Sequence, residues 1–375
     1  MKTSGQRTTL ASRESILRKA LHEHAIPGLD AMRAVAICLV VLFHQGLPVS
    51  GPLGVVVFFV LSGFLITSLL LKEIRNTGTI SLRNFYRRRA FRIFPAFYLC
   101  WIVTAVLMLA THRKIIWKEA LASFFYLANY ARAVLPVSRQ TNFFLGISWS
   151  LAIEEQFYLL WPLTLLWIWR KPRRAARVVA GIILAIWLWR AVLMVGFGVP
   201  WSYTYNAFDT RADALMVGSL LAILLYGERI PAFLLPLTSA KWLVLLPIAA
   251  LALVSRLDLY PPRSLMLQLI SFSLAPVLAA VILLQWVFWG AAGWRFLEHW
   301  SIKLIARLSY AIYLYHPMAL GLQRYIPVPH GQRLLVIPIM LAIAAASYYL
   351  VERPFMRIRD RGQRASILMD DGLKH

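Results

Sequence analysis

Residues 54–71 read GVVVFFVLSGFLITSLLL, a run of eighteen positions without a charged side chain. A run of this length and composition is typical of a helix that crosses the hydrocarbon core of a bilayer. The rest of the chain has the same character, because 60% of its 375 residues are hydrophobic and only 15% are charged. Soluble domains carry about 25% charged residues. The composition therefore indicates an integral membrane protein and excludes a disordered chain.

Ten mostly apolar runs predict an all-α, polytopic integral membrane protein with about ten transmembrane helices. They are residues 29–47, 54–71, 93–111, 150–169, 178–198, 212–226, 241–255, 265–289, 304–322 and 334–351. We expect one transmembrane domain over residues 26–355, between an N-terminal tail of residues 1–25 and a C-terminal tail of residues 356–375. The connection 112–148 contains an apolar stretch, 120–127, which suits either the membrane interface or an ordinary surface loop.

The basic residues determine the predicted orientation. The chain has 40 Lys and Arg against 16 Asp and Glu, a net charge of +24. With both termini in the cytoplasm, 28 of the 40 basic residues fall in cytoplasmic segments and ten in outer ones, in agreement with the positive-inside rule. A basic excess also occurs in nucleic-acid-binding proteins, but those carry it on a polar surface. We therefore expect a lipid bilayer, and no nucleic acid, as the partner of this chain.

Ionisable residues inside the predicted spans are candidates for function, because a charge at the bilayer centre costs about 2.5–3.5 kcal/mol on insertion scales. The first span carries Arg33 and His44. A separation of eleven residues on a helix brings both side chains to nearly the same face, about 16 Å apart along the axis. Arg33 could instead be a snorkelling anchor near the cytoplasmic end, and His44 an interfacial residue.

Three other spans carry polar groups that the predicted topology places in the outer leaflet with His44. They are Glu154 and Glu155 in the fourth span, Asp209, Arg211 and Asp213 in the sixth, and Tyr313 and His316 in the ninth. A histidine beside a glutamate is the arrangement that activates a hydroxyl by general-base catalysis. Each group could also make a helix-packing hydrogen bond, cap a helix or belong to a proton relay. Together they favour an acid–base site near the outer face.

Four arginines precede the third span, on the predicted cytoplasmic side. They are Arg87, Arg88, Arg89 and Arg92. On a helix, Arg88 and Arg92 share a face, and Arg89 is also close to Arg92. Guanidinium groups bind phosphate oxygens bidentately, so the cluster predicts a site for a phosphate-bearing cytosolic ligand. The simpler interpretation is membrane anchoring with contact to anionic lipid. No metal site is expected, since Cys38 and Cys100 have no metal-ligand spacing.

The ordered motifs of the chain resemble acyltransferase family 3, the bacterial integral-membrane O-acyltransferases. The first motif is a basic residue and a histidine separated by ten residues, here Arg33 and His44, and the others occupy residues 54–67, 85–95, 148–162, 211–215, 308–317 and 351–354. The resemblance covers residues 26–355. In the second motif the family often has an acidic residue after Gly-Val, where this chain has Val56. No carboxylate is therefore available for a role at that position.

The resemblance implies transfer of an acyl group, usually acetyl, from cytoplasmic acetyl-CoA to a hydroxyl group, by a multi-pass protein of the bacterial inner membrane. The implied acceptors are cell-envelope glycans such as lipopolysaccharide O-antigen, exopolysaccharide or peptidoglycan, or a lipid-linked sugar. In this scheme His44 is the general base, supported by Glu154 or Glu155. Arg33 lies in the donor path, and the CoA phosphates bind Arg87, Arg88, Arg89 and Arg92. The candidates for acceptor binding are Asp209, Arg211, Asp213, Tyr313 and His316.

Some members of the family also carry a C-terminal hydrolase-like domain. This sequence ends about twenty residues after its last span. We therefore expect the membrane domain to deliver the acyl group alone or with a separate glycan-assembly protein. The alternative function is a transporter of a polar solute. The separation of the arginine cluster from the His/Glu cluster favours the enzyme, because carriers place their site near the midplane.

Overall fold

The computed structural model describes residues 4–23, 25–135, 142–169, 172–257, 264–322 and 336–359, and within these ranges every regular element is a helix. The α-helices are α1 (Ser4–His22), α2 (Leu29–His44), α3 (Gly51–Thr77), α4 (Leu82–Ala110), α5 (Trp117–Phe124), α6 (Ala128–Val134), α7 (Asn142–Ile168), α8 (Pro172–Ala191), α9 (Trp201–Asn206), α10 (Phe208–Tyr226), α11 (Leu245–Leu257), α12 (Leu265–Ala291), α13 (Trp300–Leu322) and α14 (Val336–Ser347). Two π-helical turns, Val192–Gly196 and Tyr348–Glu352, continue α8 and α14. The predicted all-helical fold is confirmed.

Each of the ten predicted spans coincides with a helix. The spans fall on α2, α3, α4, α7, α8, α10, α11, α12, α13 and α14. Five segments of the described chain are long and apolar enough to cross a membrane, namely Gly51–Thr77, Leu82–Ala110, Arg174–Gly196, Leu265–Ala291 and Val336–Arg359. The total of ten spans and the cytoplasmic location of the termini remain predictions.

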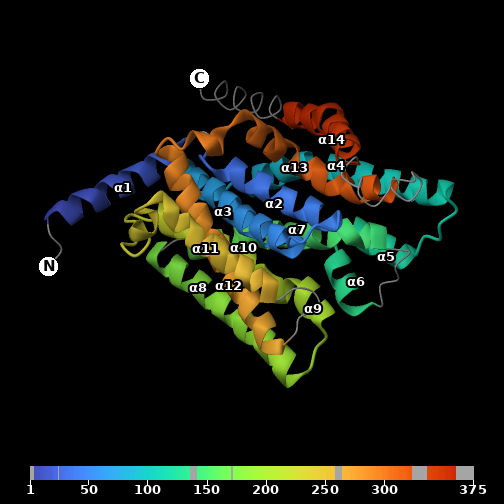
Figure 1. Cartoon of the computed structure of the whole chain (residues 1–375), viewed down its shortest axis with the longest axis horizontal. Helices are drawn as coiled ribbons and strands as arrows, with labels where there is room; N and C mark the ends of the chain where they lie inside the picture. Colours follow the sequence, from blue (N-terminus) through green and yellow to red (C-terminus); the bar gives the residue numbers. More distant parts are fainter. Residues whose placement is uncertain are drawn as a thin grey trace.

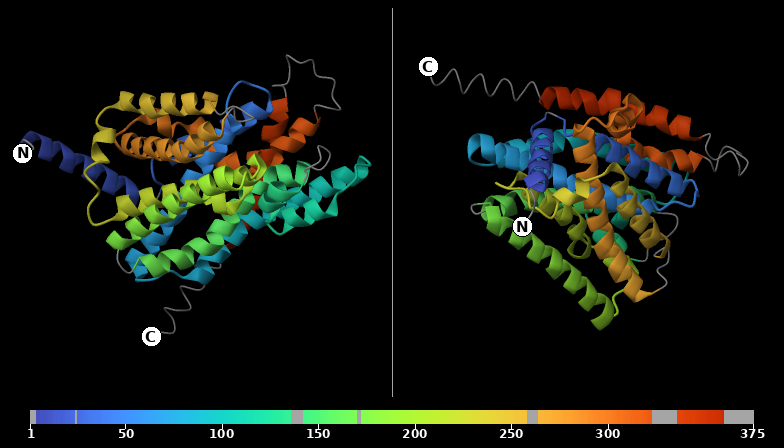
Figure 2. Two further views of the ribbon diagram at one scale, coloured as in Figure 1. Left: turned by 90° about the horizontal axis from the view of Figure 1, so that it is seen from below. Right: turned by 60° about the vertical axis from the view of Figure 1, so that its left-hand side comes forward.

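The free end of α1 and the pair α5 and α6 lie at opposite ends of the bundle (Figures 1 and 2). The predicted topology requires this, because it places the N-terminal tail inside and the 112–148 connection outside. In α5 and the turn after it, the side chains of Trp117, Leu121 and Phe125 are exposed. This apolar surface is what an interfacial segment presents to lipid. Residues 136–141 of the connection lie outside the described part of the chain.

The centre of the bundle is α3, whose backbone lies directly against that of α10. A Cβ atom built on Gly63 would lie 1.9 Å from the carbonyl oxygen of Leu215, and one built on Gly218 would lie 2.0 Å from that of Val60. Both positions therefore admit only glycine. Small residues at helix interfaces let backbones approach closely in membranes, where the hydrophobic effect does not drive helix association. The contact fixes α10 on one side of α3.

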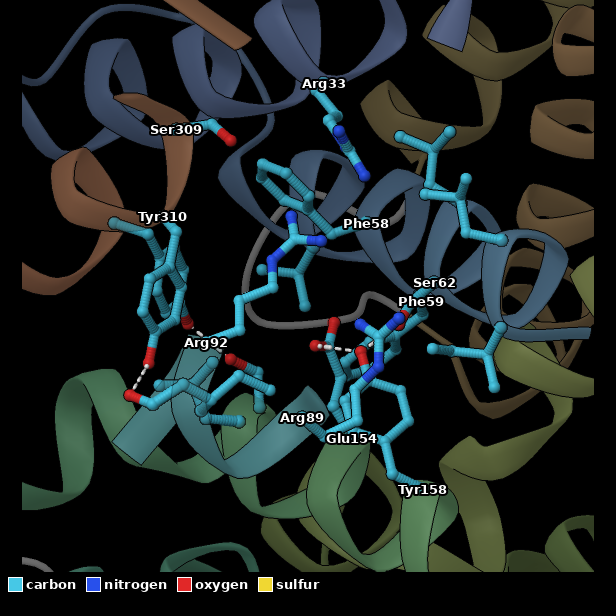
Figure 3. Close-up of a pocket in the computed structure, with 18 of the residues that line it drawn as sticks. Arg33, Phe58, Phe59, Ser62, Arg89, Arg92, Glu154, Tyr158, Ser309 and Tyr310 are labelled. Carbon is cyan, nitrogen blue, oxygen red and sulfur yellow. Dashed lines mark hydrogen bonds between the residues drawn. The ribbon is translucent and has the colours of Figure 1, made fainter. Parts of the chain in front are cut away.

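Elsewhere around α3, helices α2, α4, α7 and α13 converge on a cavity (Figure 3). Pro95 lies inside α4 and Pro162 inside α7, yet both helices continue past them. The cavity is lined by charged and hydroxyl groups as well as by apolar side chains. Because the surrounding bundle is apolar, such groups are candidates for function.

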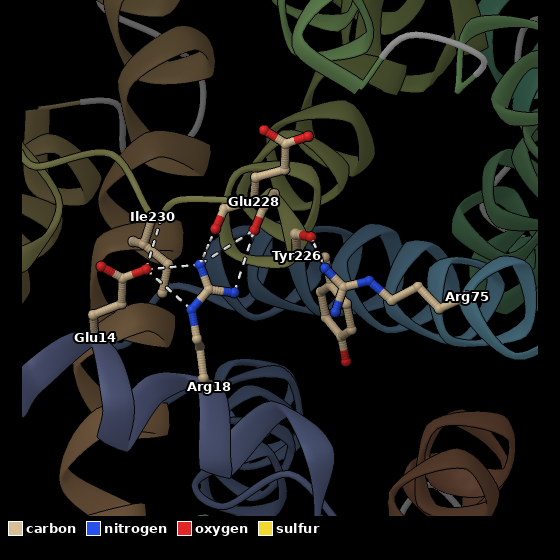
Figure 4. Close-up of polar contacts among 7 residues, drawn as sticks. Glu14, Arg18, Arg75, Tyr226, Glu228 and Ile230 are labelled. Carbon is tan, nitrogen blue, oxygen red and sulfur yellow. Dashed lines mark hydrogen bonds and ion pairs between the residues drawn. The ribbon is translucent and has the colours of Figure 1, made fainter.

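The segment predicted as an N-terminal tail contains a helix, α1, that is docked on the bundle by its C-terminal half. Leu17 is fully buried in the main core. Arg18 donates hydrogen bonds to the Glu14 carboxylate and to the carbonyl oxygen of Glu228 (Figure 4). Arg75 of α3 donates to the carbonyl of Tyr226, the last residue of α10. The two arginines thus satisfy carbonyl groups at and just beyond the C-terminal end of α10, which have no partner within the helix.

We expect Gly218→Leu to lower the stability of the fold by about 1–3 kcal/mol or more, because the added side chain forces α10 away from α3. Thermal unfolding of the purified protein in detergent measures the effect. Gly181→Leu is the matched control, since a Cβ built on this α8 glycine meets no atom within 4 Å. Equal stability of the two variants would contradict the proposed backbone contact.

Candidate functional site

Three arginines and a glutamate from three helices line the central cavity, which has a volume of about 160 Å³. Arg33 comes from α2, Arg89 and Arg92 from α4, and Glu154 from α7. Figure 3 shows the three guanidinium groups directed into the same space. We call this cavity, bounded by these four residues and Tyr158, the arginine chamber.

Hydrogen bonds and ring contacts hold the arginine chamber together on its α7 side. The Tyr158 hydroxyl donates to Glu154 Oε2 at 3.0 Å and is also hydrogen-bonded to Ser62 of α3. Tyr158 follows Glu154 by four residues, so one helical face presents both side chains. The Arg89 guanidinium lies 5.6 Å from the centre of the Tyr158 ring, a cation–π contact. Glu154 is the carboxylate that lines the chamber, and Asp30 lies 3.6 Å from Arg33 Nη1. With three guanidinium groups against these two carboxylates, the chamber keeps an excess of positive charge that suits an anionic ligand.

The structure divides the four-arginine cluster predicted from the sequence. Arg89 and Arg92 line the chamber, whereas Arg87 and Arg88 are not among its lining residues. Arg88 instead forms an ion pair with Glu73 of α3, with 2.9 Å between Nη2 and Oε2. The four arginines therefore do not form one cluster, because a carboxylate on the neighbouring helix holds Arg88 outside the chamber. Their binding to the CoA phosphates remains a prediction.

A second cavity, of about 570 Å³, contains two histidines. The rings of His44 in α2 and His316 in α13 have centroids 4.9 Å apart. Each Nδ1 lies 2.7 Å from a backbone carbonyl oxygen, that of Val40 for His44 and that of Tyr313 for His316. A carbonyl oxygen only accepts, so each Nδ1 carries a proton, and in the neutral ring Nε2 is then the basic nitrogen. We call this cavity the histidine chamber.

The two chambers are neighbours along α2. Val55 and Tyr313 line both of them. The Tyr313 hydroxyl is hydrogen-bonded to Ser150 of α7, which lines the arginine chamber. Arg33 lines the arginine chamber and His44 lines the histidine chamber, at positions about 16 Å apart along the axis of α2. Tyr313 and Ser150 therefore form a partition between a cationic cavity and a histidine cavity.

The expected pairing of His44 with a glutamate is not what the described residues form. Glu154 lies in the arginine chamber and accepts its hydrogen bond from Tyr158, while the nearest ring to His44 is that of His316. Glu155 lines neither chamber, as expected for a residue rotated by about 100° from Glu154. Glu154 is not beside His44 because the two residues lie at different depths in the bundle. Ser150 lies at the partition between the chambers, and Glu154 lies one turn further along α7, on the side of the arginine chamber.

Comparison with protein-family models identifies the chain, because the model described as an acyltransferase domain matches residues 26–352. The chain belongs to this acyltransferase family. The resemblance inferred from the sequence motifs is thereby confirmed.

Several curated bacterial proteins are similar to the acyltransferase chain. It is 32% identical over 372 residues to "Putative peptidoglycan O-acetyltransferase YrhL" of Bacillus subtilis, covering 92% of this chain and 57% of that protein. It is 37% identical over 210 residues to the peptidoglycan O-acetyltransferase OatA of Listeria monocytogenes, covering 52% and 33% of the two chains. It is 30% identical over 378 residues to the O-acetyltransferase OatA of Staphylococcus aureus, covering 93% and 60%.

The chain thus spans at most about 60% of the length of these three relatives. No solved structure matches the chain significantly.

In the acyltransferase, the predicted acceptor-binding residues of α10 are occupied by contacts within the protein. Asp213 forms a fully buried ion pair with Arg190 of α8. Asp209 accepts a hydrogen bond from Trp189 Nε1 at 2.8 Å. The Arg211 guanidinium lies 4.6 Å from the centre of the Phe272 ring. The other two candidates, Tyr313 and His316, do line the histidine chamber.

Sequence reasoning missed several residues of the two chambers, among them Ser62, Tyr158 and Arg132. Ser62 and Tyr158 form the hydrogen-bonded support of Glu154. The i,i+4 spacing of Glu154 and Tyr158 was a signal for the second of these. Arg132 of α6 lines the histidine chamber. It belongs to the irregular 112–148 connection, where no periodicity in the sequence points to it.

We expect Asp213→Asn to destabilise the acyltransferase by about 3–5 kcal/mol, because it leaves the Arg190 guanidinium buried without its counter-charge. Thermal unfolding in detergent measures the loss. The double variant Arg190→Met/Asp213→Leu removes both charges and should recover most of the stability. If Asp213→Asn kept wild-type stability but lost activity towards the acceptor, the acceptor-binding role predicted from the sequence would be favoured instead.

Proposed function

We propose that the acyltransferase transfers an acetyl group from cytoplasmic acetyl-CoA to a hydroxyl group of peptidoglycan or its precursor. The observation that carries the proposal is the pair of adjoining chambers, one lined by arginines and the other by histidines. The names of the similar proteins support acetyl as the group transferred and peptidoglycan as the acceptor, in preference to lipopolysaccharide or exopolysaccharide.

The arginine chamber is proposed as the donor site. Arg33, Arg89 and Arg92 would bind phosphate oxygens of the donor, for which their forked geometry is suited. Phe58 and Leu65 also line the chamber and would contact the apolar part of the donor arm. Cavities that enclose whole drug-sized ligands measure about 300–1,000 Å³. At about 160 Å³, the chamber would take one part of the donor and leave the adenosine towards the cytoplasm.

The histidine chamber is proposed as the place of reaction. His44 Nε2 would take the proton of the acceptor hydroxyl while the hydroxyl oxygen attacks the thioester carbonyl carbon. As the new ester bond forms, the carbon–sulfur bond breaks, and the protonated imidazole returns the proton to the leaving thiolate. The products are the acetylated glycan and free CoA. The acetyl end of the donor would reach His44 past the partition of Tyr313 and Ser150.

We expect His44→Ala to reduce acetylation of peptidoglycan by about 100-fold or more, because a general base contributes about 10²–10⁴-fold to the rate. Membranes supplied with labelled acetyl-CoA and peptidoglycan precursors, followed by mass spectrometry of the glycan, measure the transfer. His299→Ala is the matched control, since that histidine is exposed and lines neither chamber. Unchanged acetylation in His44→Ala would remove His44 from the reaction. Proton-driven solute uptake without an acetylated product would favour the transporter.

The donor assignment predicts that Arg89→Gln and Arg92→Gln each raise the KM for acetyl-CoA by about tenfold or more, since a hydrogen bond to a charged group contributes about 1.5–3 kcal/mol. Arg88→Gln serves as the control, because its ion pair with Glu73 lies outside the chamber. The KM is measured with a saturating acceptor. An equal rise in Arg88→Gln would mean that the whole arginine run binds the donor.

A further inference from the structure

The charges of the histidine chamber all have one sign. Arg113 and Arg132 line it together with His44 and His316, and no aspartate or glutamate is among its described lining residues. A cavity lined by charge of one sign raises the local concentration of ligands of the opposite sign. A neutral sugar does not need two guanidinium groups beside the reacting position. The charge of the chamber is therefore a property of the acceptor site.

Arg132 is placed to act on a ligand. It belongs to α6, is half-buried, and lies with its guanidinium carbon 5.9 Å from the centre of the Trp149 ring. None of the ion pairs formed by the described residues includes Arg132. The ring contact holds the guanidinium by its face, and its N–H donors, which lie in the guanidinium plane, can then point into the cavity.

Two aromatic rings complete this side of the histidine chamber. Trp149 and Tyr205 both line it, and their ring centroids are 5.0 Å apart. Trp149 of α7 and Tyr205 are both largely buried, so the pair forms a fixed wall. Sugar rings pack well on such walls, because their C–H groups are apolar. An aromatic wall beside a guanidinium group suits a sugar that carries an oxyanion.

We propose that the histidine chamber selects an anionic acceptor, and that Arg132, with Arg113, binds a carboxylate or phosphate oxyanion attached to the acceptor sugar. The inference rests on the proposed function, and it adds the charge class of the acceptor. A carboxylate is available on the peptide attached to the acceptor sugar in peptidoglycan, or on muramic acid that carries no peptide, and a phosphate on a lipid-linked sugar diphosphate. Both present oxygens in the geometry that guanidinium groups bind bidentately.

The test compares three acceptors in nanodiscs of neutral lipid with saturating acetyl-CoA. They are a neutral N-acetylglucosamine oligomer, a glycan of the same length that contains muramic acid, and a disaccharide linked to a lipid through diphosphate. We expect the wild-type enzyme to acetylate one or both anionic acceptors with a kcat/KM about tenfold or more above that for the neutral oligomer. The anionic acceptor that is preferred identifies the source of the oxyanion.

The variants assign the preference to Arg132. Arg132→Gln should raise the KM for the anionic acceptor by about tenfold or more and leave the KM for acetyl-CoA unchanged. Arg132→Lys keeps the charge and should recover part of the loss. Lys114→Gln is the matched control, because Lys114 is an exposed residue next to Arg113 and does not line the chamber. Thermal unfolding of each variant confirms that it is folded.

Two results would overturn the inference while leaving the proposed function intact. One is equal use of neutral and anionic acceptors by the wild-type enzyme. The other is a loss in Arg132→Gln that is the same for both kinds of acceptor. If the wild-type enzyme acetylated none of the three acceptors, the proposed function itself would fail.

Discussion

The convergence of three guanidinium groups on one cavity between α2, α4 and α7 is the constraint on which the site depends. Arg33 and Arg89 are half-buried there, and Arg92 is exposed. A charge moved from water into an apolar bundle loses a large solvation energy unless it is paired or hydrogen-bonded. Glu154 supplies one opposite charge, and Tyr158 and Ser62 hold that carboxylate in place. The balance remains positive, so the three helices meet around a space that an anion would stabilise. The features that make the chamber costly without a ligand are the same ones that would make it bind a phosphate-bearing donor.

If the proposed function holds, α2 sets the distance between the place where the donor phosphates bind and the place where the acetyl group reacts. Arg33 and His44 project from one face of a single helix into adjoining cavities, and Tyr313 lines both. Donor and acceptor would then approach from opposite ends of the bundle. Only the thioester end of the donor would have to pass the partition. Neither substrate would need to cross the membrane as a whole.

Much of this arrangement could be predicted from the sequence, because it follows from local spacing. Apolar runs located the helices. The spacing of eleven residues between Arg33 and His44 placed both side chains on one face of α2, at different depths. The pairing of side chains between helices could not be predicted, since it depends on the depth and rotation at which helices pack. The predicted spans place Glu154 at about the depth of His44 in the membrane. As α7 packs against α3 and α13, however, Glu154 lies in the arginine chamber and Ser150 lies at the partition. Arg132 could not be found because α6, with seven residues, is too short for a helical period to identify its inward-facing residues.

The attachment of α1 has a consequence for the order in which the protein is made. Arg18 binds the carbonyl of Glu228, 210 residues later in the chain, and Tyr226 donates a hydrogen bond from its hydroxyl to the carbonyl of Leu21. Most of the surface that binds α1 is therefore absent until α10, the turn after it and the later helix α12 have been synthesised. Docking of α1 is therefore completed only after the chain has been made well beyond its midpoint.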